Sequence, residues 1–288
     1  YRFQFYCQVR EDDATCFTAS NAIKITYGTA TWDGTNWTWN DGTAIDTMPT
    51  TNASVIIDGD YDTSSGGVQT SFEACDCTVN TGNTLTIENN TYVLVENDLT
   101  VDGNVIVKTD GSFVQVNDNA NVDGAVLSDK TRISVEKETA YLASYHEYTY
   151  WSSPVNGEIV SDGLEEANDN RIYYFSGQNF RDSTAETSNN NATVAGQDDI
   201  DDDANDWQFA NGATVMLPGV GYASTHDPST FINPTSYSYT FEGAFNNGIF
   251  NVPIYRNDAE TNDNNWNFIG NPYPSAIDAD LFLAANSS

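Results

Sequence analysis

The densest group of side chains that could bind a ligand is a run of carboxylates near residue 200. Ca²⁺ takes about six to eight oxygen ligands, and acidic loops supply them. The spacing does not follow the EF-hand pattern, so the alternative is a solvated loop whose charges repel one another. We expect calcium as the one cofactor, held by Asp198, Asp199, Asp201, Asp202, Asp203 and Asp206.

A second candidate for calcium lies earlier in the chain, at residues 117–121 together with Asp123. Asn and Asp at the turns of a repeat also hydrogen-bond the backbone, and this is the competing interpretation.

Aromatic side chains suggest sugar binding. Trp32, Trp37 and Trp39 lie within eight residues, and sugar rings stack on exposed indole faces. The alternative is that at least two of these rings cap a hydrophobic core. A second set is expected inside the core of a later domain: Trp151, Trp207 and Trp266.

The four cysteines indicate an oxidising compartment if they are paired. Cys7 and Cys16 flank an acidic turn at hairpin spacing, where a disulfide would close an N-terminal ribbon. Cys75 and Cys77 are separated by one residue, near the limit of disulfide reach. The cross-links Cys7–Cys75 and Cys16–Cys77 therefore stay open, and so does a zinc site.

The sequence contains no motif of a known catalytic machinery. It has no Ser–His–Asp string, no Gly-rich phosphate loop and no His-Glu-x-x-His. With 42 acidic residues, a pair of carboxylates suited to glycoside hydrolysis arises by chance. We expect a protein that is not an enzyme.

The charge excludes two classes of partner. The net charge is −32 and the sequence pI is near 4.1. Nucleic acid and anionic membranes would be repelled. Such a charge favours solubility in a salty medium, where repulsion is screened beyond about 10 Å.

A repeat with a period of 20 residues indicates the elements that position these side chains. Val79–Asp98 aligns with Leu99–Asp118 without a gap. The alignment places Val79 over Leu99, Leu85 over Val105, Ile87 over Val107 and Val93 over Phe113. Short apolar-alternating strands separated by turn residues predict a β-solenoid, and a meander of hairpins is the alternative.

The solenoid is expected to have about three coils, since a third copy of the repeat begins with Val122, which corresponds to Val101 at a spacing of 21 residues. Stacked coils need caps on their end strands, and the Trp-rich segment before the repeat is the candidate. Beyond residue 140, strands rich in Tyr and Phe predict a β-sandwich.

The sequence therefore predicts an all-β chain, with a short right-handed parallel β-solenoid followed by a jelly-roll-like β-sandwich. The hand follows from the preference for right-handed parallel crossovers. The expected parts are an N-terminal strand segment, which ends a preceding region (1–30), a solenoid with its Trp-rich cap (31–135) and a sandwich truncated at its C-terminus (136–288).

Six strings of residues occur in a recognisable order between residue 31 and about residue 283. They are Trp32-Asp33-Gly34 with Trp37, Phe72-Glu73-Ala74-Cys75, Tyr150-Trp151-Ser152-Ser153-Pro154-Val155, Pro218-Gly219-Val220-Gly221-Tyr222, Phe241-Glu242-Gly243 with Asn246-Asn247-Gly248, and Phe268-Ile269-Gly270-Asn271-Pro272-Tyr273-Pro274-Ser275. This order resembles the large surface proteins of Bacteroidetes, especially flavobacteria. Those proteins are exported by the type IX secretion system and include adhesins and gliding-motility-associated proteins. The resemblance implies an extracellular, surface-attached location and supplies no catalytic residue.

Two triplets are similar to the O-glycosylation motif of the same bacteria. They are Asp46-Thr47-Met48 and Asp182-Ser183-Thr184. The similarity implies glycans on Thr47 and Ser183, both in predicted loops, where a glycan must be.

We expect a non-catalytic adhesin or structural stalk module, stiffened by calcium. Its expected partners are surface glycans or other cell-surface proteins, the secretion machinery and further copies joined in a filament. The alternative is a carbohydrate-binding module of a secreted polysaccharide-degrading enzyme. An enzyme in its own right is least favoured, because parallel β-helices that degrade polysaccharides usually have more coils and a basic residue in their cleft.

Overall fold

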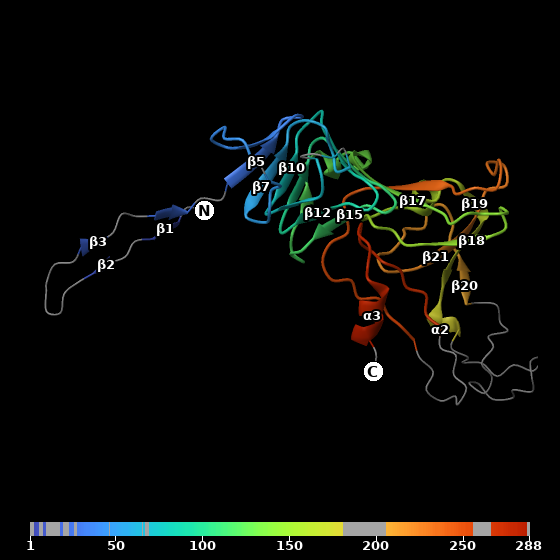
Figure 1. The fold of residues 1–288 in the computed structure, drawn as a ribbon. Helices are drawn as coiled ribbons and strands as arrows, with labels where there is room; N and C mark the ends of the chain where they lie inside the picture. Colours follow the sequence, from blue (N-terminus) through green and yellow to red (C-terminus); the bar gives the residue numbers. More distant parts are fainter. Residues whose placement is uncertain are drawn as a thin grey trace, which may run out of the picture.

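The computed structural model describes residues 28–45, 47–64, 66, 69–180, 206–255 and 266–286, and the backbone of four strands before residue 28. Most elements are strands, as the composition predicts (Figure 1). The strands before the repeat are β1 (Phe3–Phe5), β2 (Gln8–Val9), β3 (Thr18–Ala19), β4 (Ile23–Ile25), β5 (Gly28–Trp32), β6 (Trp37–Trp39), β7 (Ala53–Ile57), β8 (Tyr61–Asp62) and β9 (Phe72–Ala74). Those of the repeat and just after it are β10 (Cys77–Val79), β11 (Thr84–Ile87), β12 (Tyr92–Val95), β13 (Leu99–Val101), β14 (Asn104–Val107), β15 (Ser112–Gln115), β16 (Val122–Asp123) and β17 (Ile133–Glu138).

The C-terminal half adds five strands and most of the helical turns. The strands are β18 (Tyr148–Trp151), β19 (Ala167–Phe175), β20 (Trp207–Phe209), β21 (Tyr222–His226) and β22 (Ser238–Glu242). The helical turns are η1 (Ala125–Leu127), η2 (Lys130–Arg132), α1 (Val160–Gly163), α2 (Gly177–Phe180) and α3 (Ala279–Asn286).

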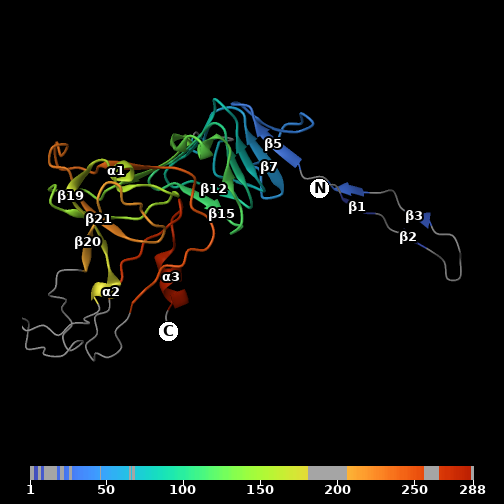
Figure 2. The same ribbon diagram turned by 180° about the vertical axis from the view of Figure 1, so that it is seen from behind.

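The four short strands before β5 form an antiparallel ribbon. Strand β1 pairs with β4, and β2 pairs with β3. Both views show this ribbon extending away from the rest of the molecule (Figures 1 and 2). The predicted N-terminal strand segment therefore has its own local pairing.

Residues 28–138 form a three-sided β-solenoid of parallel strands. One side is β16-β13-β10-β7-β5, the second is β17-β14-β11-β8 and the third is β15-β12-β9. Side chains alternate between the buried interior and the surface along each strand, as the pleat requires. The predicted solenoid is confirmed, and the competing hairpin meander is wrong.

The interior is built from equivalent apolar side chains in successive coils. Leu85 lies beside Val105 and Val93 beside Phe113, in parallel register, and all four are buried. The sequence predicted both of these columns. They form a continuous core in which each coil covers the apolar layer of the next.

Two other predicted columns are wrong. Leu99 lies beside Cys77 rather than Val79, and Val122 lies beside Leu99 rather than Val101. The spacing on the first side of the solenoid is therefore 22 residues between Cys77 and Leu99.

A shortened turn explains the uneven spacing. Residues 80–83 join β10 to β11, whereas only residues 102–103 join β13 to β14. Gly103 allows the short turn, because a Cβ there would lie 2.3 Å from the carbonyl oxygen of Asn83 in the neighbouring coil.

The Trp-rich segment caps the N-terminal end of the solenoid, as predicted. Trp32 and Trp37 are buried, and their ring centroids lie 5.5 Å apart. Tyr61 and Phe72 complete the aromatic layer through edge contacts. Strand β6 pairs with the edge of β5, the first strand of this side of the solenoid, and so covers that edge. The chain at Ala44 pairs in turn with β6.

Asn and Asp side chains at the corners bind the adjacent coil. Asn80 Nδ2 donates to Asp58 Oδ1 at 2.8 Å, and the backbone N–H of Asn121 donates to Asp98 Oδ1 at 2.8 Å. The Asn117 side chain donates to Asn97 of the coil before it. At residues 117–121, the second candidate for calcium, the structure therefore shows side chains that form hydrogen bonds at turns.

The second region is an antiparallel sheet joined to the solenoid through β17. Strand β17 pairs parallel with β14 on one edge and antiparallel with β22 on the other. A four-stranded antiparallel sheet of order β18-β21-β19-β20 packs against β22 (Figures 1 and 2). The ring centroids of Trp151 and Tyr239 lie 4.5 Å apart across this contact.

A buried carboxylate also joins the two regions. The Glu158 side chain is inaccessible to solvent and accepts a hydrogen bond from the backbone N–H of Glu242 at 2.6 Å. Lys130 lies 3.3 Å from the same carboxylate and also pairs with Asp162. A buried charge needs such partners, because it has lost its water.

The C-terminal segment covers a further edge of the solenoid. The backbone N–H of Phe113 in β15 donates to the carbonyl oxygen of Pro274 at 2.8 Å. The rings of Phe113 and Phe245 stack with centroids 4.7 Å apart. Buried side chains of both regions therefore form one hydrophobic core.

We predict that Leu85→Ala lowers the free energy of unfolding by about 2–5 kcal/mol, because the vacated space lies between fixed coils. Thr86→Ala, on the outward face of the same strand, should cost less than about 1 kcal/mol. Urea denaturation followed by tryptophan fluorescence measures both changes. Equal losses for the two variants would contradict the inward stacking of Leu85.

Candidate functional site

The outer face of the antiparallel sheet carries the most prominent group of exposed aromatic rings among the described residues. Strands β18, β19 and β20 each contribute two rings at alternate positions, so all six point to the same side. We call this set the aromatic face: Tyr148, Tyr150, Tyr173, Phe175, Trp207 and Phe209.

The small side chain of Ala223 creates a trough across this face. Ala223 in β21 lies opposite Tyr150 on one side and Tyr173 on the other. The hollow above it measures about 350 Å³ and is walled by Tyr148, Tyr150, Tyr173 and Trp207. Tyr150 is 66% exposed and Trp207 is 42% exposed.

A second hollow continues the trough toward the C-terminal segment. It measures about 500 Å³ and lies among Tyr150, Trp207, Trp266 and Phe268. The Phe268 ring has its centroid 5.3 Å from that of Tyr150 and 6.0 Å from that of Trp207. Gly221 leaves room for Phe268, because a Cβ there would lie 2.7 Å from the ring.

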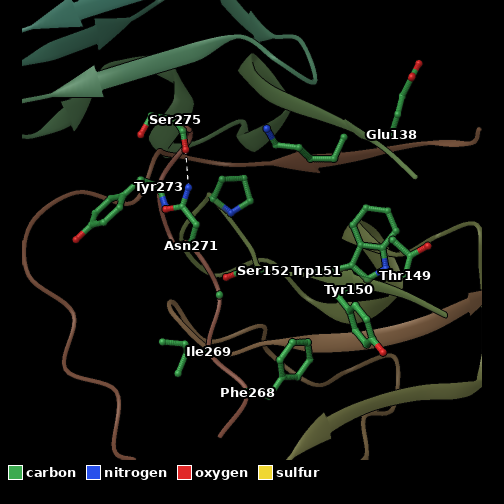
Figure 3. A pocket seen from close by; sticks show the side chains of 13 residues that line it. Glu138, Thr149, Tyr150, Trp151, Ser152, Phe268, Ile269, Asn271, Tyr273 and Ser275 are labelled. Carbon is green, nitrogen blue, oxygen red and sulfur yellow. Dashed lines mark hydrogen bonds between the residues drawn. The ribbon is translucent and has the colours of Figure 1, made fainter. Parts of the chain in front are cut away.

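A cavity of about 370 Å³ opens on the other side of Tyr150 and Phe268 (Figure 3). Lys137 and Ser152 contribute polar groups to its lining. The Lys137 ammonium group donates to the carbonyl oxygen of Thr109 at 2.8 Å, and burial lowers its pKa. We call this space the end cavity, because it lies at the end of the trough.

The end cavity has polar walls formed partly by the Gly-Asn-Pro-Tyr-Pro-Ser string. Asn271 donates to the carbonyl oxygen of Ser275, as the dashed line in Figure 3 shows. Tyr273 donates to the carbonyl oxygen of Gly248 at 2.6 Å. The first bond constrains the segment itself and the second ties it to the chain at Gly248, so together they fix one wall of the cavity.

Strand alternation separates the aromatic face from the core. Trp151 follows Tyr150 and points inward, where its Nε1–H donates to Ser224 Oγ at 2.9 Å. Tyr222 and Ile172 are also buried on the inner side. Because the inner side is filled by the contact with β22, the outer side is left open to solvent.

The tryptophans considered for sugar stacking lie in the solenoid cap, as the alternative interpretation predicted. Trp32 and Trp37 are buried in the solenoid cap and cannot contact a sugar, and Trp39 packs against that core. Trp207 and Trp266 were expected in the core and are 42% and 62% exposed. Strand alternation within β20 was the available signal for Trp207, since Phe209 follows it two residues later.

The acidic run lies almost wholly outside the described residues, which include only Asp206 of the six predicted ligands. Asp206 Oδ1 accepts the backbone N–H of Trp207 at 2.8 Å. In the described part of the chain, no group of three or more His, Cys, Asp or Glu side chains could hold a metal ion. Calcium binding stays a prediction.

Cys75 and Cys77 carry free thiols, so the structure does not contain the disulfides considered for them. The Cys77 side chain points into the solenoid core, where a partner from the N-terminal ribbon would have to enter the packed interior. Burial raises the pKa of this thiol to about 12, so it stays protonated. Cys7 and Cys16 lie outside the described residues.

Of the two glycosylation candidates, the structure describes Thr47, which is exposed. Ser183 lies outside the described residues. An exposed hydroxyl is compatible with modification, and glycosylation stays a prediction.

His226 is the buried histidine of this region. Its Nδ1 lies 2.8 Å from the Tyr239 hydroxyl, and its Nε2 lies 3.2 Å from Thr230 Oγ1. Burial lowers the pKa of His226, although nearby Glu166 and Asp227 oppose the shift. These contacts occupy both ring nitrogens, and the ring is 2% exposed, so His226 is part of the packed interior.

Comparison with known proteins gives one match. A family model described as "Domain of unknown function (DUF8693)" matches residues 31–288. Neither the curated proteins nor the solved structures include a match to this chain. No helix among the described residues is long and apolar enough to cross a lipid bilayer.

We predict that His226 makes the stability of the protein depend on pH. Unfolded histidine binds a proton near pH 6.5, whereas buried His226 binds one only at lower pH. Stability should therefore fall as the pH decreases below about 6.5, because the unfolded state then binds more protons.

The check compares urea midpoints at neutral and mildly acidic pH. His226→Gln should show a smaller loss on acidification than the wild type, whereas the exposed His146→Gln should lose as much as the wild type. An unchanged pH dependence in His226→Gln would show that His226 does not contribute.

Proposed function

We propose that this chain, which belongs to the DUF8693 family, is a non-catalytic adhesion module displayed on the outside of a cell. The observation that carries this proposal is the aromatic face, an exposed set of rings on a sheet whose other side packs Trp151 and Ile172 into the core. Exposed apolar patches on a folded domain are typical of interaction sites.

The solenoid supports this role as a rigid base. Its parallel strands are held by backbone hydrogen bonds and by corner side chains that bind the adjacent coil. Strand β17 then continues directly into the region that carries the aromatic face. A module of this kind holds a binding surface at a fixed position with little conformational freedom, which reduces the entropy lost on binding.

The location and export route rest on the sequence. The order of its motifs resembles proteins that the type IX secretion system carries to the cell surface. The net charge of −32 suits a medium in which salt screens repulsion. Calcium bound by the acidic run would add a further constraint to the loop beside β20.

A carbohydrate-binding module of a secreted polysaccharide-degrading enzyme is the second candidate. The same aromatic trough favours it, because flat rings with polar edges suit the apolar faces of sugars. The two candidates share the binding surface and differ in what is attached to the module.

Three of the strand edges through which copies could join into a filament are already paired or covered. The edge of β6 pairs with the chain near Ala44, and the edge of β17 is covered by β22. On β15, Phe113 donates to Pro274. Open edges are what one chain uses to add to another, so we propose surface glycans or other surface proteins as partners.

We predict that attachment depends on Trp207. Cells that produce the protein should be labelled by an antibody without permeabilisation, and cells carrying Trp207→Ala should attach to a conditioned surface several-fold less than wild-type cells. Tyr92→Ala is the matched control, because Tyr92 is a similarly exposed aromatic residue on the solenoid. Normal attachment of the Trp207→Ala cells, or labelling only after permeabilisation, would contradict the proposal.

A further inference from the structure

The three hollows around Tyr150 are adjacent and share lining residues, and we call them together the groove. Tyr150 lines all three, Phe268 is shared by the second hollow and the end cavity, and Trp207 is shared by the two hollows of the trough. The groove therefore runs from Trp207 and Trp266, past Phe268 and Tyr150, to Lys137. An extended ligand can contact flat rings along most of this path.

Among the described residues, few of those that line the groove are charged, although the chain as a whole is strongly acidic. The charged lining residues are Lys137, Glu138 and Asp206, against 42 acidic residues in the sequence. Glu138 lies at the rim, where its carboxylate points away from the other side chains in Figure 3. One carboxylate oxygen of Asp206 is taken by a backbone N–H.

The aromatic residues also provide polar edges. Tyr148 and Tyr150 are exposed at 42% and 66%, and each presents a phenol ring with a hydroxyl at its tip. Trp207 and Trp266 have indole N–H groups, and Lys137 uses one of its three N–H donors on Thr109. Rings for stacking and scattered hydrogen-bonding groups match a ligand that alternates C–H faces with hydroxyl groups.

From this arrangement we propose that the groove binds a neutral polysaccharide chain. Its sugar rings lie on Trp207, Phe268 and Tyr150, and the unit at the end enters the end cavity beside Lys137. We infer that the polysaccharide is neutral from the net charge of the protein, −32. This charge repels polyuronates and sulfated glycans as it repels other polyanions. This inference rests on the proposed function and names the ligand of the same surface.

The test measures binding of the full chain to polysaccharides by affinity gel electrophoresis and titration calorimetry. The neutral probes are galactomannan, laminarin and arabinoxylan, and the anionic probes are alginate and polygalacturonate. We expect binding to at least one neutral probe and none to the anionic probes at low salt. The affinity should increase from the disaccharide to the hexasaccharide of the bound polymer, because a longer oligomer fills more of the groove.

Three variants locate the site. Trp207→Ala should weaken binding by about tenfold or more, which corresponds to about 1.4 kcal/mol. Trp207→Tyr keeps an aromatic face and should recover much of the affinity, which a purely structural role of the indole would not predict. Tyr92→Ala on the solenoid should bind like the wild type.

Failure of this inference can be told apart from failure of the proposed function. If no neutral probe binds, if alginate binds as well as the neutral probes, or if Trp207→Ala binds normally, the glycan assignment is overturned. If attachment of cells still depends on Trp207 in that case, the adhesive role stands with a different ligand. If attachment is independent of Trp207, the adhesive role itself fails.

Discussion

The structure depends on strand β17, which belongs to two kinds of sheet at once. On one edge it continues the parallel stack of the solenoid through Val105 and Ile133. On the other edge it pairs antiparallel with β22, whose Phe241 lies opposite Val135. Side chains on the inner side of this strand pair fill the end of the solenoid and the start of the second region. One strand therefore carries the solenoid core into the part of the molecule that holds the aromatic face.

This continuity determines which surface is available for binding. The four-stranded sheet presses Trp151 against Tyr239 and Phe241, so its inner side is used for folding. The outer side retains aromatic rings, although burial of large apolar side chains would be favourable by about 25 cal/mol per Å² of apolar surface. These exposed rings form the surface for which we propose a role in recognition. The buried side chain of Glu158 at the junction contacts both regions, through the backbone N–H of Glu242 in β22 and through Lys130 in η2.

The sequence was sufficient to predict the solenoid, because its apolar residues recur at a nearly fixed spacing. Leu85 and Val105 could be aligned without a structure, and the corner Asn and Asp side chains could be assigned to turns. The pairing of Cys77 with Leu99 could not be predicted in this way. The turn at Gly103 is two residues shorter than the equivalent turn in the coil before it, but the aligned sequences show no gap there.

The binding surface was harder to predict, because exposure of an aromatic residue depends on what packs against its strand. Trp32 and Trp207 look alike in sequence, as each lies in a short strand with another aromatic or apolar residue nearby. Trp32 lies in the core because the first coil needs a cap, whereas Trp207 lies on the side of its sheet opposite the one that packs Trp151 against β22. Such tertiary contacts join residues that are far apart in the chain, as Trp32 with Tyr61 and Trp151 with Ser224. Local sequence patterns do not contain that information.

The central claim is that the solenoid and the antiparallel region unfold as one unit through β17. Hydrogen–deuterium exchange followed by mass spectrometry tests it directly, with peptides covering β14, β17 and β22 in the wild type and in Leu85→Ala. The account predicts that a cavity at Leu85 in β11 accelerates exchange in all three strands by a similar factor, because they share one cooperative core. Acceleration confined to β14, with unchanged exchange in β22, would contradict it.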